Sequence, residues 1–220
     1  MADPKTILAF GDSLTWGFDG VTRTRHPFES RWPNVLQAEL GAGFHVIAEG
    51  LNGRTTGYDD HLADCDRNGA RILPTLLHTH APLDLVILFL GVNDLKPFTG
   101  AGARGAAMGM GRLIEQVRHH AWSGGDGDAA PAVLVVAPPP IRKPDDPDYG
   151  DTFADAVEDS KSFARRYGDL ARERGCDFFD AGTVVTTDPH DGIHLDADNT
   201  VALGHALAPV VRELLNERQG

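Results

Sequence analysis

Residues 85–90, LVILFL, constrain the fold of this chain more than any other stretch. These six apolar residues follow one another without polar alternation, as in a strand buried on both faces of a parallel sheet. Shorter apolar runs predict four more strands, at residues 7–10, 44–48, 132–137 and 176–179. Segments with helical periodicity separate these runs. A flavodoxin-like α/β fold is therefore expected, with about five parallel strands between two layers of helices.

The predicted helices carry ordinary start and stop signals. Ser30 is expected to cap the first helix, which ends at Leu40, and Asp196 is expected to cap the last. Pro74 is expected to interrupt the second helix, because proline lacks the N–H that a helix interior needs. The other helices are predicted over residues 68–80, 105–121 and 153–174, with loops over residues 19–29, 122–131 and 142–151.

Length and charge limit the classes of protein and partner. The 220 residues suit a single domain over residues 1–220. The formal net charge of −12 argues against nucleic-acid or anionic-membrane partners, because both need a basic face. Cys65 and Cys176 are the only cysteines and are expected to stay reduced. No secretion signal opens the sequence and no apolar run approaches the roughly 20 residues that span a bilayer. A cytoplasmic protein without a membrane partner is expected.

The first predicted strand ends abruptly at Gly11-Asp12-Ser13. A serine at such a break projects into a cleft where backbone N–H groups can face developing negative charge. Alone, the pattern is weak, since such a serine is more often a turn or cap residue. Near the other end of the chain, Asp191 and His194 stand three residues apart, so that the carboxylate can hold the imidazole from behind. Ser13, His194 and Asp191 are therefore a candidate catalytic triad.

Two further residues directly follow predicted strands. Gly53 lies in the loop LNGRTT and Asn93 lies in GVND. A backbone N–H and a side-chain amide are the donors that an oxyanion hole uses, and the N–H of Ser13 is a third. Because ligands of such sheets bind at the carboxyl ends of the strands, these residues are expected on one rim with Asp191 and His194.

Other motifs have weaker support. Residues 100–105, GAGARG, match the dinucleotide fingerprint, but the preceding strand is predicted to end about ten residues earlier, which disfavours nucleotide binding. His78 with His80 and His119 with His120 lack the spacing of zinc ligands on a helix, so no metal site is expected.

Several residues beside these motifs have two interpretations. His190 is adjacent to Asp191 and is the alternative base. We interpret Asp12 and Asp94 as residues that brace the serine and the asparagine next to them. Lys96 is expected to be an ordinary surface lysine, with a place at the rim of the cleft as the alternative.

Apolar residues near the triad are candidates for a substrate-binding wall. Trp16 follows the serine by three residues and either packs in the core or lines the pocket for the acyl or alcohol group. Phe153 and Ile193 are weaker candidates for the same wall, and Ile193 gains support from its place inside DGIH.

Taken together, the four motifs resemble those of the SGNH, or GDSL, hydrolases. That family has a serine in a GDSL block, a glycine in a second block, an asparagine in GxND and a DxxH block, here Ser13, Gly53, Asn93 and Asp191 with His194. The likeness runs over residues 6–215. GDSLTWG, RWPNVL and LDLVILFLGVND are most similar to the arylesterase/acyltransferase branch.

The resemblance implies the SGNH-hydrolase fold and a serine esterase that cleaves short-chain carboxylic esters through an acyl-serine intermediate. It also implies acyl transfer to alcohols, no cofactor, an alcohol or water as the acceptor, and a homo-oligomer, by analogy an octamer. Within the class, a carbohydrate deacetylase and a thioesterase or lysophospholipase are the alternatives. Outside it, the alternative is a flavodoxin-like binding module.

Overall fold

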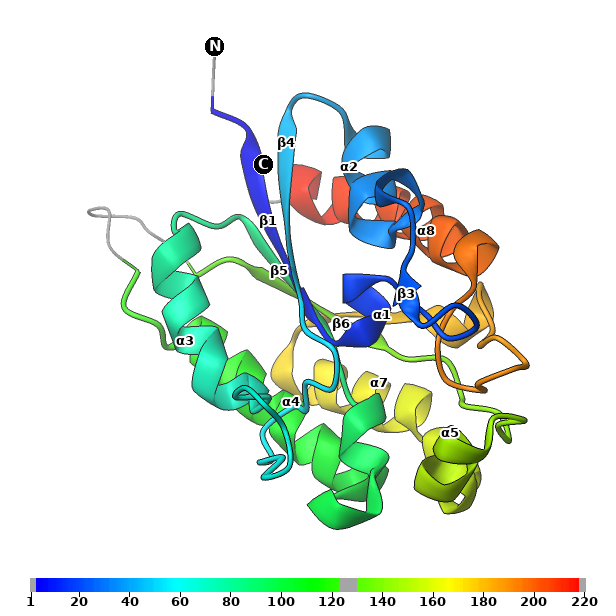
Figure 1. The fold of residues 1–220 in the computed structure, drawn as a ribbon. Coiled ribbons are helices and arrows are strands. Elements are labelled where there is room, and N and C mark those ends of the chain that lie inside the picture. The colour runs from blue at the N-terminus through cyan, green and yellow to red at the C-terminus, as the bar shows by residue number, and fades with distance from the viewer. Residues whose placement is uncertain (1–2, 123–129, 218–220) are drawn as a thin grey trace.

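The computed structural model describes residues 3–122 and 130–217 and contains one central parallel sheet (Figure 1). Its strands run in the order β4-β1-β5-β6-β7. Their bounds are β1 Lys5–Gly11, β4 Phe44–Gly50, β5 Leu85–Phe89, β6 Ala132–Ala137 and β7 Asp177–Asp180. All four pairings between neighbours are parallel. The predicted five-stranded α/β fold is confirmed.

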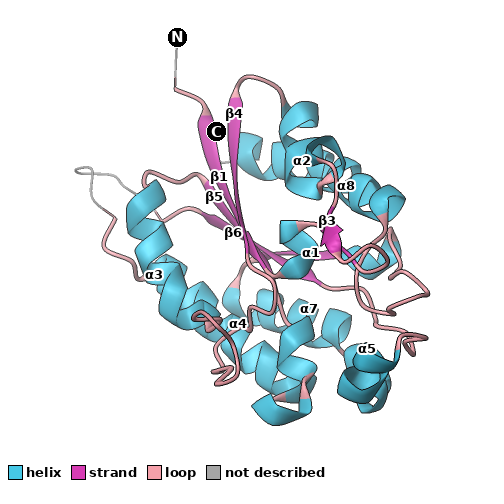
Figure 2. Ribbon diagram, in the orientation of Figure 1, coloured by secondary structure: helices cyan, strands magenta, loops and turns pink. Residues whose placement is uncertain are grey.

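The helices form a layer on each side of the sheet (Figures 1 and 2). One layer holds α2 (Trp32–Leu40) and α8 (Ala197–Glu217), and the other holds α3 (Gly69–His80), α4 (Gly102–Arg118) and α7 (Phe163–Arg174). Because helices cover both faces, every residue of β5 is at most 1% exposed. No described helix is both long and apolar enough to cross a bilayer.

Of the predicted helix caps and breaks, one is confirmed and the others are wrong. Asp196 caps α8 as expected, with its Oδ1 accepting a hydrogen bond from the amide of Asn199 at 2.8 Å. The prediction that Pro74 interrupts its helix is wrong, because α3 continues through it. Pro74 leaves the carbonyl of Ala70 without its helical donor, and Gln116 Nε2 of α4 donates to that oxygen at 2.6 Å instead.

The prediction that Ser30 caps the helix before Leu40 is also wrong. Ser30 closes a 3₁₀ turn, Phe28–Ser30, and α2 starts after Arg31 without a side-chain cap. Asn34 Nδ2 instead donates to the carbonyl of Phe28, at 2.6 Å, and ties the turn to the helix.

One long helix over residues 153–174 is not formed. The segment divides into α5 (Pro147–Phe153), a 3₁₀ turn, α6 (Val157–Ser160) and α7. Ser160 Oγ accepts from the amide of Ile141 at 3.1 Å, and Asp159 Oδ2 accepts from the amide of Ala103 at 2.6 Å. These polar side chains bind backbone groups of other segments, which favours a break in the helix at this point.

Two predicted loops contain secondary structure. Residues 19–29 include the return strand of a small hairpin, β2 (Phe18–Asp19) with β3 (Thr24–Arg25). Residues 142–151 include the start of α5. The loop predicted over residues 122–131 lies mostly outside the described ranges.

Candidate active site

Ser13 begins the four-residue helix α1 (Ser13–Trp16) directly after β1. Asp12 caps this helix, with its Oδ1 accepting from the amide of Leu14 at 2.9 Å. Gly17 ends it in the left-handed conformation, with φ of 86°. The turn is tight, since a Cβ on Gly11 would lie 2.0 Å from Thr15 Oγ1. Ser13 is thereby fixed at the carboxyl end of the sheet.

The side chain of His194 connects Ser13 to Asp191. Its Nε2 lies 2.9 Å from Ser13 Oγ, and its Nδ1 lies 2.6 Å from Asp191 Oδ2. The other oxygen of Asp191 accepts from the amides of Ile193 and His194, at 2.8 and 2.9 Å. With Nδ1 donating to the carboxylate, Nε2 is left as the acceptor for the serine proton.

Asp191 is fully buried and has a lowered pKa. Burial by itself would raise the pKa of this carboxyl group. The hydrogen bonds and the charge interaction with His194, together with the two amides, outweigh burial and favour the carboxylate. Asp191 is therefore suited to stabilise an imidazolium on His194.

Gly53 and Asn93 lie beside the serine at the ends of β4 and β5. Gly53 has φ of 81°, which favours glycine, and a Cβ there would lie 2.5 Å from Arg67 Nη1. Asn93 Nδ2 donates to the carbonyl of Arg54 at 3.1 Å, which orients the amide. The structure thus brings together Ser13, Gly53 and Asn93, the predicted donors of an oxyanion hole.

Arg54 supports this arrangement and was not among the predicted site residues. It is buried, with its guanidinium 4.3 Å from the centre of the Phe10 ring. Its Nη1 donates to the carbonyls of Gly11 and Glu49, which ties the ends of β1 and β4 together. Burial lowers the pKa of Arg54 to about 10. The only sequence signal was its place directly after Gly53.

Asp12 and Asp94 accept hydrogen bonds from backbone amides and do not line the cleft. Asp12 caps α1, and its Oδ2 lies 3.5 Å from Asn93 Nδ2. Asp94 accepts from the amide and hydroxyl of Thr56, so it fixes the loop that carries Gly53. Burial raises the pKa of each carboxyl group to about 7.

A cleft of about 140 Å³ contains the serine and histidine. Its polar wall consists of Asn52, Gly53, Arg67, Asn93 and Lys96. Its apolar wall, called the aromatic wall for its three rings, consists of Phe18, Tyr149, Phe153 and Ile193. A larger groove of about 540 Å³ between α4 and α7 contains none of the predicted site residues.

The structure places two of the three predicted wall residues in the cleft. Phe153 and Ile193 line it, whereas Trp16 does not. The ring of Trp16 instead stacks against Arg25, whose guanidinium carbon lies 4.7 Å from the ring centre. Arg25 Nε also donates to the carbonyl of Trp16 at 2.7 Å, and Phe18 lines the cleft instead.

Phe18 and Tyr149 are cleft residues that the sequence analysis missed. Their ring centres lie 4.6 and 5.8 Å from that of His194. Phe18 directly precedes the loop predicted over residues 19–29, and Tyr149 lies in the loop predicted over residues 142–151, so no periodicity pointed to either. Lys96 also lines the cleft, which corrects its expected role as an ordinary surface lysine.

The rival motifs lie elsewhere. The side chain of His190 is 49% exposed and lies 4.0 Å from Asp146, not beside the serine. Residues 100–105 connect a 3₁₀ turn to α4 and do not follow a strand. Among the described residues, no three His, Cys, Asp or Glu side chains are grouped as a metal site requires. Cys65 and Cys176 are both free.

Most of the chain is similar to known proteins. Residues 9–205 match the GDSL-like Lipase/Acylhydrolase family. A carbohydrate acetylesterase family member from Sinorhizobium meliloti has 55% sequence identity and a TM-score of 0.93, over 96% of this chain and 99% of that chain. Est24, a carbohydrate acetylesterase from Sinorhizobium meliloti, has 43% identity and a TM-score of 0.90 over the same shares.

An aryl esterase from M. smegmatis has 45% identity and a TM-score of 0.88, again over 96% of this chain and 99% of that chain. No curated protein matches the chain. The region that matches the family contains Ser13, Gly53, Asn93, Asp191 and His194.

Proposed function

Because the chain belongs to the GDSL-like lipase/acylhydrolase family, we propose that it is a serine esterase that cleaves short-chain carboxylic esters through an acyl-serine intermediate. The observation that carries the proposal is the continuous hydrogen-bonded arrangement of Asp191, His194 and Ser13, at 2.6 and 2.9 Å. Nucleophile, base and orienting carboxylate are the groups that acyl transfer to serine requires.

In the proposed reaction, Ser13 Oγ attacks the ester carbonyl while His194 Nε2 takes the hydroxyl proton. Asp191 stabilises the imidazolium that forms. The backbone N–H groups of Ser13 and Gly53 and the amide of Asn93 bind the oxyanion. His194 then returns the proton to the leaving alcohol, and water attacks the acyl-serine by the same steps in reverse order.

The size of the cleft supports short acyl groups. Its volume of about 140 Å³ is well below the roughly 300–1,000 Å³ of pockets that enclose drug-sized ligands. An acetyl group and a small leaving alcohol fit such a space better than a long acyl chain. This disfavours a lysophospholipase, whose substrates carry long chains.

Hydrolysis of p-nitrophenyl acetate tests the proposal directly. We expect turnover that a serine-directed phosphonate abolishes, with one phosphonate adduct per chain on the peptide that contains Ser13. Activity is expected to fall from p-nitrophenyl acetate to p-nitrophenyl octanoate. No turnover and no adduct would instead support a flavodoxin-like binding module.

A carbohydrate acetylesterase is the second candidate, since structural neighbours with that description are 55% and 43% identical to this chain. The polar wall offers hydrogen-bonding groups for sugar hydroxyls. Acetate release from acetylated monosaccharides, compared with phenyl acetate and an acetyl thioester, separates this activity from an arylesterase or a thioesterase.

We also propose acyl transfer to alcohols. The aromatic wall can bind the apolar part of an alcohol, and burial of each methylene contributes about 0.8 kcal/mol to binding. The protein is incubated with vinyl acetate and benzyl alcohol in buffer, and benzyl acetate and acetate are followed together. Rapid acetate formation with benzyl acetate no higher than in the enzyme-free control would identify a plain hydrolase.

The homo-oligomer, an octamer by analogy, and the cytoplasmic location remain predictions. Exposed apolar side chains such as Val21 and Phe28, which are 59% and 66% exposed, are available for contacts between copies. Sedimentation velocity measures the assembly, and a monomer at all accessible concentrations would contradict the octamer.

A further inference from the structure

Lys96 is a cation that lines the cleft, and hydrogen bonds fix its backbone. It follows the 3₁₀ turn Val92–Leu95, which also carries Asn93. Its amide donates to the carbonyl of Asn93 at 3.3 Å, and its own carbonyl accepts from Thr99 Oγ1 at 2.8 Å. The start of the Lys96 side chain therefore keeps a fixed relation to the oxyanion hole.

The ammonium group of Lys96 has no anionic partner in the described part of the chain. No carboxylate oxygen lies within 4.0 Å of its Nζ, and no hydrogen bond engages it. Its closest aromatic contact is the ring of Phe98, whose centre lies 5.7 Å away. Arg67, the other cation of the cleft, is different, since it lies 3.2 Å from Asp64 and 4.0 Å from Asp60.

The surroundings of Lys96 favour the arrival of a negative charge. Burial lowers the pKa of Lys96, and the positive charge of Arg67 acts in the same direction, while Asp60, Asp12 and Asp94 act against them. A half-buried cation without a close partner has lost part of its hydration. A carboxylate that enters the cleft restores a charged hydrogen-bond partner to it.

We propose that Lys96 binds a carboxylate of the substrate, so that this enzyme prefers esters with a carboxylate close to the scissile bond. The proposal rests on the esterase function proposed above and names its substrate class. The carboxylate can belong to the acyl group or to the leaving alcohol, since both lie in a cleft of about 140 Å³. Elsewhere, the net charge of −12 repels such a substrate, so a half-buried cation without a close anionic partner in the cleft of the serine makes that cleft selective.

Two matched pairs of esters test the proposal and distinguish the two positions. The first pair is 3-acetoxybenzoate and its methyl ester, followed by acetate release, with the carboxylate on the leaving group. The second is monophenyl succinate and its methyl ester, followed by phenol release, with the carboxylate on the acyl group. The measured quantity is the ratio of kcat/KM for the charged ester to kcat/KM for the neutral one.

In Lys96→Met, we expect this ratio to fall roughly tenfold to a hundredfold for at least one pair, mostly through KM, as on loss of a charged hydrogen-bond partner. Lys96→Arg keeps the charge and should retain most of the ratio. Lys161→Met is the control, because it removes the same charge from an exposed lysine that pairs with Glu158. The control should leave the ratio unchanged.

An equal fall for charged and neutral esters in Lys96→Met would overturn the proposal, because Lys96 would then act on the oxyanion common to both. An unchanged ratio for both pairs would also overturn it. If Lys96→Met does not fold, inhibition of the wild type decides, since benzoate should inhibit more strongly than benzamide, and equal inhibition would refute the proposal. If the wild type does not hydrolyse p-nitrophenyl acetate, the proposed esterase function itself is wrong, which is a separate outcome.

Discussion

The polar wall of the cleft comes from loops after β4 and β5, whereas most of the aromatic wall comes from the β2–β3 hairpin and α5. On the polar side, buried Arg54 binds the ends of two strands and its carbonyl orients Asn93. On the aromatic side, ion pairs of Arg23 join the hairpin to Asp146, directly before α5, and to Asp148 within it, and the side chain of Arg23 is 55% exposed. The groups proposed for chemistry are therefore held by the core, and those proposed for specificity are held at the surface.

Two buried carboxyl groups repeat this contrast. Asp191, behind His194, has a lowered pKa because the interactions with the histidine and two amides outweigh burial. Asp12 accepts from the amide of Leu14 and lies near the charge of Arg54, but burial outweighs both and raises its pKa to about 7. Interactions thus favour the charged form of the buried acid that is expected to stabilise an imidazolium, whereas burial favours the neutral form of the acid near the proposed oxyanion.

The largest expected effect on kcat belongs to Ser13 and His194, which lie between the two walls. Ser13→Ala and His194→Ala should each lower kcat by about 10⁴- to 10⁶-fold, because each removes a step that the remaining residues cannot supply. The residual rate should come from the oxyanion hole and binding. His190→Ala is the matched control and should retain activity, and the opposite result for the two histidines would transfer the base to His190.

The next effect separates the walls. Asn93→Ala should lower kcat by roughly 10²- to 10³-fold with a smaller change in KM, because an oxyanion donor acts mainly in the transition state. Phe153→Leu, on the aromatic wall, should instead change KM more than kcat. Steady-state kinetics with p-nitrophenyl acetate measure both, and an unchanged kcat in Asn93→Ala would remove that residue from the oxyanion hole.

The third effect concerns stability rather than rate. A folded-state pKa of about 7 for Asp12, above the ordinary value of 3.8, means that its contribution to folding is most favourable at low pH and is lost as pH rises toward 7. In Asp12→Asn, which keeps an oxygen to cap α1, this loss is absent. The change in unfolding free energy between pH 5 and 8 should therefore differ from wild type by about 2–3 kcal/mol.

Denaturant unfolding at the two pH values gives this difference. Asp198→Asn, at an exposed position of the same residue type, is the control and should keep the wild-type pH dependence. If Asp12→Asn also keeps it, Asp12 is ionised throughout and does not provide the contrast with Asp191.

The sequence predicted Gly53 and Asn93 of the polar wall, because both directly follow strands. An apolar run that ends in a turn places the next residue at the edge of the sheet, so Ser13, Gly53 and Asn93 needed no tertiary information. Arg54 could not be predicted in the same way, because its role depends on two carbonyl groups that come together only when β1 and β4 pair.

The aromatic wall was partly missed for a physical reason. The hairpin contains only two-residue strands, which are too short to show alternation, and α5 is a seven-residue helix in a Pro- and Asp-rich segment. Both are stabilised by contacts between segments far apart in the chain. Trp16 was a candidate for the cleft or the core from its distance to Ser13 in sequence, but its ring lies against Arg25.

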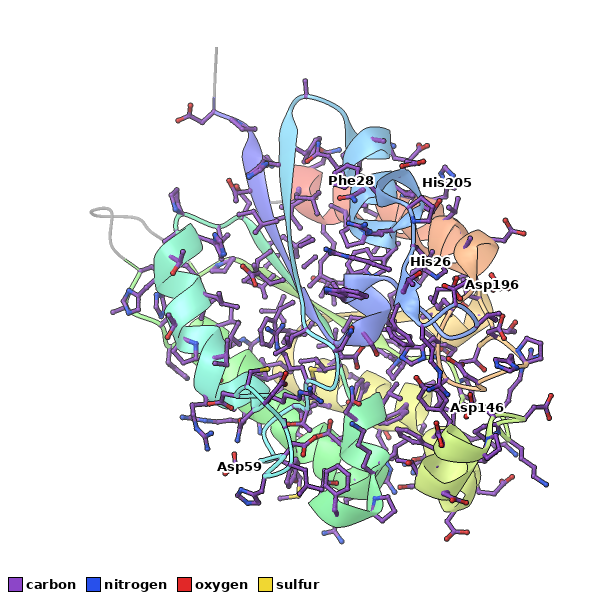
Figure 3. The ribbon with its side chains drawn as sticks, in the orientation of Figure 1. His26, Phe28, Asp59, Asp146, Asp196 and His205 are labelled. Atoms are coloured by element: carbon purple, nitrogen blue, oxygen red, sulfur yellow. The ribbon has the colours of Figure 1, made fainter. Side chains whose placement is uncertain are left out.

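The smallest expected effect tests whether the surface ion pairs position the aromatic wall. Arg23 Nη2 lies 2.9 Å from Asp146 Oδ2 and 3.1 Å from Asp148 Oδ2. Asp146 directly precedes α5, the helix that contains Tyr149 and Phe153, and Figure 3 shows Asp146 beside this helix. Arg23 has φ of 55°, a conformation that asparagine tolerates well. Arg23→Asn therefore removes the ion pairs with little added backbone strain.

We expect Arg23→Asn to raise KM about two- to fivefold with kcat nearly unchanged, since exposed ion pairs contribute little but these two join both parts of the wall. Asp146→Asn should have a similar effect, and the double variant should be no worse than either single one, because both remove the same contact. Additive effects would mean that each residue acts separately. A fall in kcat comparable to that of Asn93→Ala would show that the hairpin also holds His194, and the division between a wall for chemistry and a wall for specificity would not stand.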